Sequence, residues 1–149
     1  MNSQPSTQSR HLPVMLMESL ENLNIKNNGI YVDGTLGLGG HSEEILKQID
    51  SGFLLGIDRD SESIDLANKR LSSYNNYKLF HDSYQNLKNI LIELDIKDVD
   101  GILLDLGLSS FQLENNQRGF SHKHSSDLDM RFDKEIDSNT ADEIIKKYD

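Results

Sequence analysis

The chain has 149 residues, of which 36% are hydrophobic, and this is enough for the core of one domain. It contains no cysteine, which excludes a disulfide scaffold and favours the cytoplasm, and it lacks both the roughly 20-residue apolar stretch of a membrane span and the apolar core of a signal peptide. A net charge of −10 argues against a nucleic-acid partner, although total charge does not show where Lys and Arg lie.

Strand-like and helix-like patterns alternate along the first two thirds of the chain. Residues 1–10 are polar and are expected to be disordered, and a helix is expected to follow, with Pro13 in its first turn. Further helices are predicted where apolar residues recur every three or four positions, at 45–49, 64–71 and 87–94. Short apolar runs predict strands at 30–32, 53–57, 77–80 and 102–104. This alternation predicts the α/β class with a doubly wound parallel sheet.

The pattern changes at the fourth predicted strand. Residues 102–104 show no polar alternation, so we expect this strand to be covered on both faces. No regular pattern extends from 106 to 137, and Thr140 with Glu143 then forms a capping-box pair that starts another helix. Because a doubly wound nucleotide-binding fold usually has more than four strands, we expect the chain to be a fragment of such a fold.

A glycine-rich loop joins the first predicted strand to the next helix. It reads DGTLGLGGHS from Asp33 to Ser42, with glycine at 37, 39 and 40. Glycine tolerates positive φ angles and has no Cβ, so the backbone can approach a bulky ligand closely. An ordinary tight turn is the alternative, but the flanking strand and helix favour a nucleotide-type cofactor. The spacing departs from the GxGxxG of dinucleotide-binding proteins, which favours S-adenosylmethionine over a cofactor with a pyrophosphate.

Polar side chains follow each of the predicted strands. Because the carboxyl ends of parallel strands line one crevice, we expect these side chains to meet there: Asp33, Asp58, His81, Asp82 and Asp105. Asp58 follows the glycine loop by about 20 residues and is predicted to accept hydrogen bonds from ribose hydroxyls. In the alternative interpretation, Asp58 or Asp60 caps the next helix.

Other side chains near the loop allow two interpretations each. His41 either contacts the methionine end of the cofactor or is a polar residue at a helix start. Tyr84 either packs on adenine or belongs to the core. His122 and His124 lie in a polar loop, where solvated histidines are more common than metal ligands, so no metal is predicted.

Six motifs in fixed order add a family resemblance to these patterns. They are spread over residues 11–148 and read HLPVMLMESL, YVDGTLGLGGHS, GIDRD, DGILLDLGLSSFQLE, RGFS and LDMRFD. In their order and spacing the chain resembles the bacterial 16S ribosomal RNA (cytosine-N4) methyltransferase family. The resemblance implies a Rossmann-like class I methyltransferase that uses S-adenosylmethionine to methylate N4 of a cytidine in the decoding region. Its partner would be 16S ribosomal RNA or the small ribosomal subunit.

The same resemblance implies a cofactor site and a domain division. The cofactor-binding residues carried over by motif are Gly39, Gly40, His41, Asp58, Tyr84, Asp105 and Gln112. Residues 11–110 would form the N-terminal part of the S-adenosylmethionine-binding domain, and residues 111–149 the start of an inserted helical region for substrate recognition. Tyr84, Phe132 and Glu114 stand where relatives often carry Phe, Met and Asp, and all three changes are mild.

Some functional questions stay open at this point. A nicotinamide-dependent dehydrogenase would share the sheet and the ribose carboxylate, but the glycine spacing disfavours it. A truncated, non-catalytic module would bind an adenosyl cofactor without transferring a methyl group. No catalytic group is assigned, although Asp105 is a candidate acceptor for an N–H of the substrate amine. Arg118 and Arg131 are candidate phosphate contacts or, alternatively, members of ion pairs with nearby carboxylates.

Overall fold

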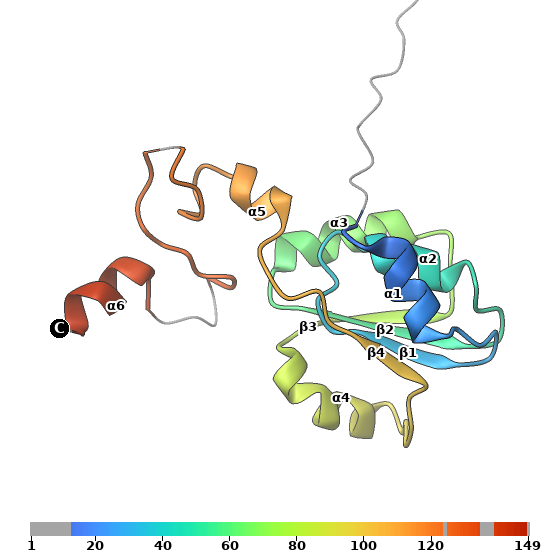
Figure 1. The fold of residues 1–149 in the computed structure, drawn as a ribbon. Helices are drawn as coiled ribbons and strands as arrows, with labels where there is room; N and C mark the ends of the chain where they lie inside the picture. Colours follow the sequence, from blue (N-terminus) through green and yellow to red (C-terminus); the bar gives the residue numbers. More distant parts are fainter. Residues whose placement is uncertain (1–12, 124, 135–138, 149) are drawn as a thin grey trace, which may run out of the picture.

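The fold is built on one parallel sheet of four strands in the order β3-β2-β1-β4, as Figure 1 shows. The computed structural model describes residues 13–123, 125–134 and 139–148, so the predictions for residues 1–10 and for His124 lie outside the described residues. The strands are β1 (Ile30–Asp33), β2 (Phe53–Asp58), β3 (Tyr77–His81) and β4 (Gly101–Leu103). Each predicted strand is present to within one residue at either end, which confirms the α/β class.

Helices cover the two faces of the sheet unequally. On one face lie α1 (Leu16–Leu23), α2 (Gly40–Leu46) and α3 (Ser61–Leu71), and on the other lies α4 (Leu87–Glu93), which follows a single 3₁₀ turn, η1 (Tyr84–Asn86). The α1–α3 face buries a cluster that includes Tyr31 and Leu54, and the α4 face buries Val32 and Leu55. Tyr31 and Val32 are adjacent in sequence, as are Leu54 and Leu55. They lie on different faces because consecutive strand residues point to opposite sides of a sheet.

The first helix begins later than the sequence predicts. The prediction placed Pro13 in its first turn, whereas α1 starts at Leu16. Met15 precedes it with φ 52°, in the left-handed region, so the helix cannot extend back through this residue. Pro13 instead lies against the glycine loop, where a Cβ added to Gly40 would meet Pro13 Cγ at 2.4 Å. The segment before α1 therefore packs near the carboxyl end of β1, where the glycine loop begins.

The prediction that the fourth strand is covered on both faces was wrong. Leu103 is buried against α1, but Ile102 and Leu104 are 48% and 46% exposed. Strand β4 pairs with β1 only, so it forms an edge of the described sheet. Ile102 is in register with Val32, on the α4 face, and α4 packs against residues of β1 and β2 rather than β4. An uninterrupted apolar run cannot reveal which of its faces is left uncovered.

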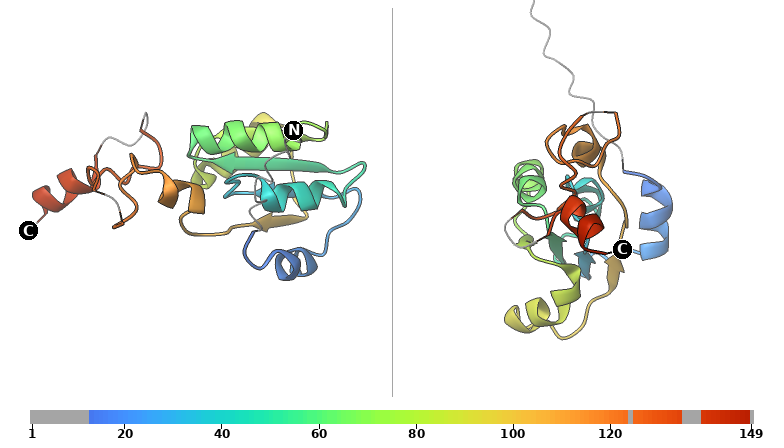
Figure 2. Two further views of the ribbon diagram at one scale, coloured as in Figure 1. Left: turned by 90° about the horizontal axis from the view of Figure 1, so that it is seen from above. Right: turned by 90° about the vertical axis from the view of Figure 1, so that its left-hand side faces the viewer.

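The chain after β4 extends away from the sheet, as Figure 1 and the left view of Figure 2 show. It contains a short helix, α5 (Ser110–Glu114), which the sequence pattern did not predict, and the predicted helix α6 (Ala141–Lys147). The capping box is confirmed: Thr140 Oγ1 accepts from the Glu143 backbone N–H at 3.2 Å, and the Glu143 carboxylate accepts from the Thr140 N–H at 2.8 Å. In the part of the chain that the structure describes, no helix has the length and apolar character of a membrane span.

Candidate functional site

A cavity of about 400 Å³ lies at the carboxyl ends of the strands. Strands β2 and β4 flank β1 on opposite sides, so the chain reverses its direction of strand addition at β1. In open parallel sheets such a reversal leaves a crevice between the loops, and ligands bind there. The volume falls in the range of about 300–1,000 Å³ that is usual for small-molecule sites.

Six of the seven predicted site residues line this cavity: Gly40, His41, Asp58, Tyr84, Asp105 and Gln112. Gly39 lies immediately behind the cavity wall, at the N-cap of α2 with φ 73°. Of the other strand-end residues, Asp82 lines the cavity, whereas Asp33 and His81 do not. The expectation that all strand-end polar groups share one crevice was therefore wrong for Asp33 and His81.

The glycine loop combines left-handed backbone with close packing. Gly37 and Gly39 have φ angles of 50° and 73°. A Cβ added to Gly39 would lie 3.2 Å from the Cβ of Ala67 on α3. Glycine at position 39 therefore lets α3 approach the loop while the loop turns toward the cavity.

We expect Gly39→Ala to destabilise the fold by about 1–3 kcal/mol, because the left-handed φ and the contact with Ala67 both disfavour a side chain. Gly37→Ala is the matched control, since its added Cβ would meet only a carbonyl oxygen at 3.9 Å and would report the backbone cost alone. Urea unfolding of both variants measures the difference. Equal losses for the two would show that the packing against α3 contributes nothing.

Asp58 holds the glycine loop and faces the cavity. Its Oδ2 accepts from the Gly37 N–H at 2.7 Å, and its Oδ1 accepts from the Asp60 N–H at 2.9 Å. Burial raises the pKa of the Asp58 carboxyl, and the backbone hydrogen bonds from Asp60 and Gly37 counteract part of this rise. Each carboxylate oxygen still has acceptor capacity, which suits hydroxyl donors from a ligand.

Asp33 has a structural role instead. It is 1% exposed, accepts from Ser42 Oγ at 2.7 Å, and accepts from the Thr35 N–H at 3.3 Å. Burial raises the pKa of Asp33, and the Ser42 hydroxyl counteracts this rise. Asp33 thus ties the start of the loop to α2 rather than meeting a ligand.

This arrangement predicts how Ser42→Ala changes the pH dependence of stability. An acid whose pKa is raised by folding favours the folded state most below its unfolded pKa, and that advantage is lost as pH rises through the folded pKa. Removing the hydroxyl takes away a donor that favours the ionised form of Asp33, so we expect a loss of about 1–3 kcal/mol above the folded pKa of Asp33 and a smaller loss below it. Urea unfolding over a series of pH values checks this. A loss that does not depend on pH would contradict it.

His41 and Tyr84 approach the cavity from different elements. His41 is in the first turn of α2 and is 6% exposed, and its Nε2 has no hydrogen-bond partner among the described residues. A buried ring nitrogen of this kind is suited to a polar ligand atom. Tyr84 is 40% exposed at the cavity, which argues against the alternative that it is a core residue. Asp105 is also exposed, and its backbone N–H donates to Thr35 Oγ1 at 2.7 Å.

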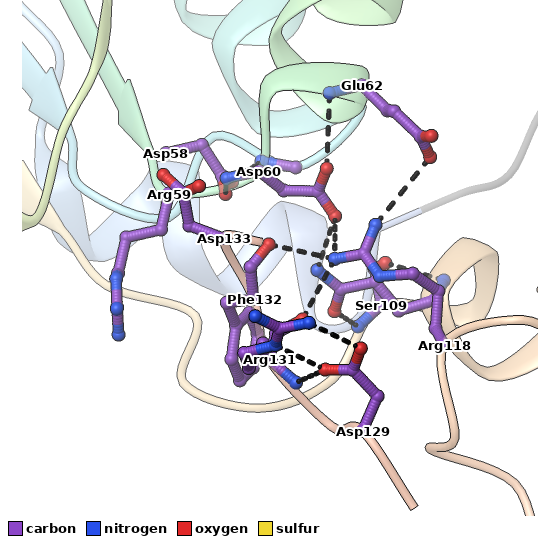
Figure 3. Close-up of polar contacts among 12 residues, drawn as sticks. Asp58, Arg59, Asp60, Glu62, Ser109, Arg118, Asp129, Arg131, Phe132 and Asp133 are labelled. Atoms are coloured by element: carbon purple, nitrogen blue, oxygen red, sulfur yellow. Dashed lines mark hydrogen bonds and ion pairs between the residues drawn. The ribbon is translucent and has the colours of Figure 1, made fainter. Parts of the chain in front are cut away.

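A buried polar cluster joins the loop after β2 to the segment after β4, as Figure 3 shows. Asp60 caps α3 by accepting from the Glu62 N–H, which confirms the predicted cap. Its other carboxylate oxygen accepts from Gln112 Nε2 and from the Arg118 guanidinium, both at 3.0 Å. The predicted site residue Gln112 thus lines the cavity while its amide is held by Asp60.

Both arginines that were candidate phosphate contacts form ion pairs. The Arg118 side chain is 6% exposed and pairs with Asp60. Arg131 pairs with Asp129 through two hydrogen bonds of 2.7 and 2.9 Å, and the Arg131 side chain lowers the pKa of Asp129 to about 2. The structure therefore favours the ion-pair alternative for Arg118 and Arg131.

Sequence reasoning missed several residues of the cavity wall. Phe132 comes from the segment after β4, and its ring packs at a tilt of 59° on that of Phe120, with the centroids 5.4 Å apart. Arg59 follows Asp58 directly, and Pro13 packs against Gly40 of the glycine loop. Membership of the GIDRD and LDMRFD motifs was the available signal for Arg59 and Phe132. Within the described ranges, no three His, Asp or Glu side chains are grouped as metal ligands would be.

Comparison with known proteins identifies the family. The model of the MraW methylase family matches residues 8–149. The chain belongs to this family. Membership confirms the resemblance seen in the motifs, and with it the class I methyltransferase fold and S-adenosylmethionine as the family's cofactor.

Relatives with high identity all carry the same description. Ribosomal RNA small subunit methyltransferase H from Halothermothrix orenii is 50% identical over 139 residues, which are 93% of this chain and 44% of that protein. A protein of the same name, numbered 1, from Acholeplasma laidlawii is 49% identical over 140 residues, 94% of this chain and 46% of that one. The chain thus spans less than half the length of these curated relatives.

Solved structures share the fold at low identity. A candidate rRNA methylase from Clostridium thermocellum has a TM-score of 0.57 at 23% identity, over 66% of this chain and 55% of that one. A SAM-dependent O-methyltransferase from Thermotoga maritima has a TM-score of 0.51 at 20% identity, over 63% of this chain and 35% of that one. At these identities the likeness supports the MraW-family fold and does not extend to substrate.

Proposed function

We propose that this MraW-family chain binds S-adenosylmethionine in the cavity at the carboxyl ends of the strands and methylates N4 of a cytidine in the decoding region of 16S ribosomal RNA. The observation that carries the cofactor site is the convergence on one cavity of about 400 Å³ of five residues from three of the motifs, Gly40, His41, Asp58, Asp105 and Gln112, together with Tyr84. The rRNA substrate is supported by the names of the relatives, and the N4 position by the motif resemblance.

The residues of the cavity suit the parts of the cofactor. Asp58 would accept hydrogen bonds from the ribose hydroxyls, and the aromatic face of Tyr84 would pack on the adenine side. The buried Nε2 of His41 would bind a polar group at the methionine end. Gly39 and Gly40 let the backbone approach, and Asp105 and Gln112 complete the wall.

Methyl transfer to an exocyclic amine requires alignment and desolvation more than a nucleophilic side chain. When bound, S-adenosylmethionine supplies an electrophilic methyl group on a sulfonium. The lone pair of the cytosine amine is delocalised into the ring, so an acceptor for its N–H helps the nitrogen to pyramidalise. Asp105 is exposed at the cavity and is the carboxylate that we assign to this role.

A second candidate is an adenosyl-cofactor-binding module that transfers no methyl group. The observation that raises it is that the 149-residue chain corresponds to 44–46% of the length of these relatives. In this case the cavity would bind the cofactor with the same residues, and this chain on its own would transfer no methyl group.

Two measurements on the 149-residue chain decide between these functions. Calorimetric titration with S-adenosylmethionine, with NADH as the comparison ligand, tests the cofactor. A radiolabel transfer assay on small-subunit RNA and on assembled small subunits tests the reaction. Binding with transfer supports the enzyme, binding without transfer supports the module, and binding of NADH alone would contradict both.

The acidic composition of the chain affects how its binding to RNA should be tested. The net charge is −10, and the two arginines that were candidate phosphate contacts are engaged with Asp60 and Asp129. RNA binding driven by phosphate contacts is strongly weakened by salt. The assay is therefore best run at low and at physiological ionic strength, with the small subunit as well as naked RNA.

A further inference from the structure

Asp60 stands at the centre of the buried cluster but does not line the cavity. Its carboxylate is 2% exposed, and it connects the segment after β4 to the loop that carries Asp58. On one side its backbone N–H donates to Asp58 Oδ1 at 2.9 Å. On the other side its Oδ2 accepts from Gln112 and Arg118. Two cavity residues that are 54 positions apart, Asp58 and Gln112, are thus joined through one aspartate.

Arg118 extends the same connection to a third cavity residue. Its Nη2 donates to the backbone carbonyl of Phe132 at 2.8 Å and to that of Arg131 at 3.3 Å. The Arg118 guanidinium also lies over the ring of Phe120, which packs on the ring of Phe132. Phe132 is therefore held from its backbone and from its ring, and its position depends on where Arg118 sits.

The bonding pattern is directional enough to position these groups. The Asp60 carboxylate and the carbonyls of Arg131 and Phe132 all surround Nη2 of Arg118, and Nη1 lies 3.6 Å from a Glu62 carboxylate oxygen, so acceptors from two segments of the chain converge on one end of the guanidinium. An ion pair buried to this degree is weak evidence for stability, because an apolar pair of the same shape can stabilise a fold as well, so we attribute a geometric role to this pair. Loss of either partner leaves the other as a buried, unpaired charge.

We propose that Asp60 and Arg118 form a positioning pair that sets Gln112 and Phe132 against Asp58 and so shapes the cofactor cavity. The inference rests on the proposed function, because the ligand whose affinity it governs is S-adenosylmethionine. Neither residue touches the cavity, and both act through side chains that do. Arg118 is thus assigned a positioning role inside the protein in place of a contact with an RNA phosphate.

The variants are chosen to separate positioning from folding. Asp60→Asn keeps the shape and one acceptor oxygen, so it can keep the helix cap, while its amide nitrogen replaces the acceptor for Gln112 and Arg118 and the charge is lost. Arg118→Met removes the guanidinium, and Arg118→Lys keeps a charge but lacks the planar group that lies over the Phe120 ring. Asp129→Asn is the matched control, because it alters an Asp–Arg pair of the same segment that makes no hydrogen bond to Asp60.

Calorimetric titration of S-adenosylmethionine into the 149-residue chain and its variants is the first measurement. We expect Asp60→Asn and Arg118→Met each to raise the Kd about tenfold, the equivalent of one buried hydrogen bond. The double variant should lose little more than either single variant, because partners in one network are not additive. Arg118→Lys should lie between Arg118→Met and the unaltered chain, and Asp129→Asn should stay within twofold.

Hydrogen exchange of the backbone amides of residues 129–133 is the second measurement. In the unaltered chain we expect exchange to slow when S-adenosylmethionine is added, and in Arg118→Met we expect it not to change. A merely structural pair would lower the unfolding midpoint but leave this ligand-dependent slowing intact. Should Arg118→Met fail to fold, Arg118→Lys gives the same comparison.

These measurements distinguish a failure of this inference from a failure of the proposed function. If the unaltered chain binds no S-adenosylmethionine, the proposed function and this inference both fall. If it binds and the folded Asp60 and Arg118 variants bind equally well, or if their losses are additive, the positioning pair alone is overturned. If Asp129→Asn weakens binding as much as Asp60→Asn, the effect belongs to the whole segment and the pair is again overturned.

Discussion

Asp58→Ala is expected to weaken binding of S-adenosylmethionine by at least about 150-fold. A carboxylate that accepts from two ribose hydroxyls contributes about 1.5–3 kcal/mol for each charge-assisted bond, and two such bonds are lost together. The Gly37 and Asp60 N–H groups would also lose their acceptor, which loosens the glycine loop. Calorimetric titration measures the affinity, and a cooperative unfolding transition, at a somewhat lower midpoint, shows that the fold is retained.

The ionisation of Asp58 also predicts how the affinity for S-adenosylmethionine depends on pH. The ionised carboxylate is the better acceptor, so affinity should rise as pH increases through the pKa of Asp58 and level off above it. Because burial raises this pKa, the rise should occur above the pH at which an ordinary aspartate titrates. Asp58→Asn is the control, since it retains the shape but cannot ionise and should bind weakly at every pH. An affinity that is level across acidic pH in the unaltered chain would refute the assignment.

The second large effect is expected at Asp105, on transfer rather than on binding. Asp105→Ala should lower methyl transfer to small-subunit RNA by about 100- to 1,000-fold, the usual cost of one lost group that stabilises developing charge. Its carboxylate is exposed at the cavity, and its backbone N–H is held by Thr35 Oγ1, so the substitution leaves the loop anchored. The Kd for S-adenosylmethionine should change by less than tenfold.

Single-turnover transfer with radiolabelled cofactor tests this prediction. Asp105→Asn keeps an acceptor oxygen without the charge and should retain part of the rate, which makes it the matched control. Turnover and cofactor affinity that are both unchanged in Asp105→Ala would show that Asp105 has no role in the site. If the unaltered chain binds cofactor but transfers no methyl group, the binding-module alternative is supported instead.

Much of the site could be predicted because its signals are local. A strand followed by a glycine loop and a helix places the backbone of residues 37–40 at the carboxyl end of the sheet, whatever the distant partners are. Asp58 ends a strand and Asp105 follows one by two residues, so both had to lie near that end. The DGILLDLGLSSFQLE motif added Gln112, and the family resemblance favoured the adenine-side interpretation of Tyr84 over the core one.

The remaining features depend on which neighbour is packed against a residue. Asp33 and Asp58 both end a strand next to glycine-loop residues, yet Ser42 and Thr35 enclose the first while the second faces the cavity. Arg118 resembles an exposed phosphate contact in sequence, and only the approach of Asp60, 58 residues earlier, makes it a buried member of an ion pair.

The amino-acid sequence by itself determined the four strands, most of the helices, the parallel direction of the strands, the position of the glycine loop and the family, because periodicity, turn chemistry and motif spacing are properties of neighbouring residues. The tertiary structure alone decided that β4 leaves Ile102 and Leu104 uncovered, that α5 forms, and that Asp60 joins Gln112 and Arg118 to the loop of Asp58. These are contacts between segments far apart in the chain, and their energies depend on burial and direction, which no local pattern records.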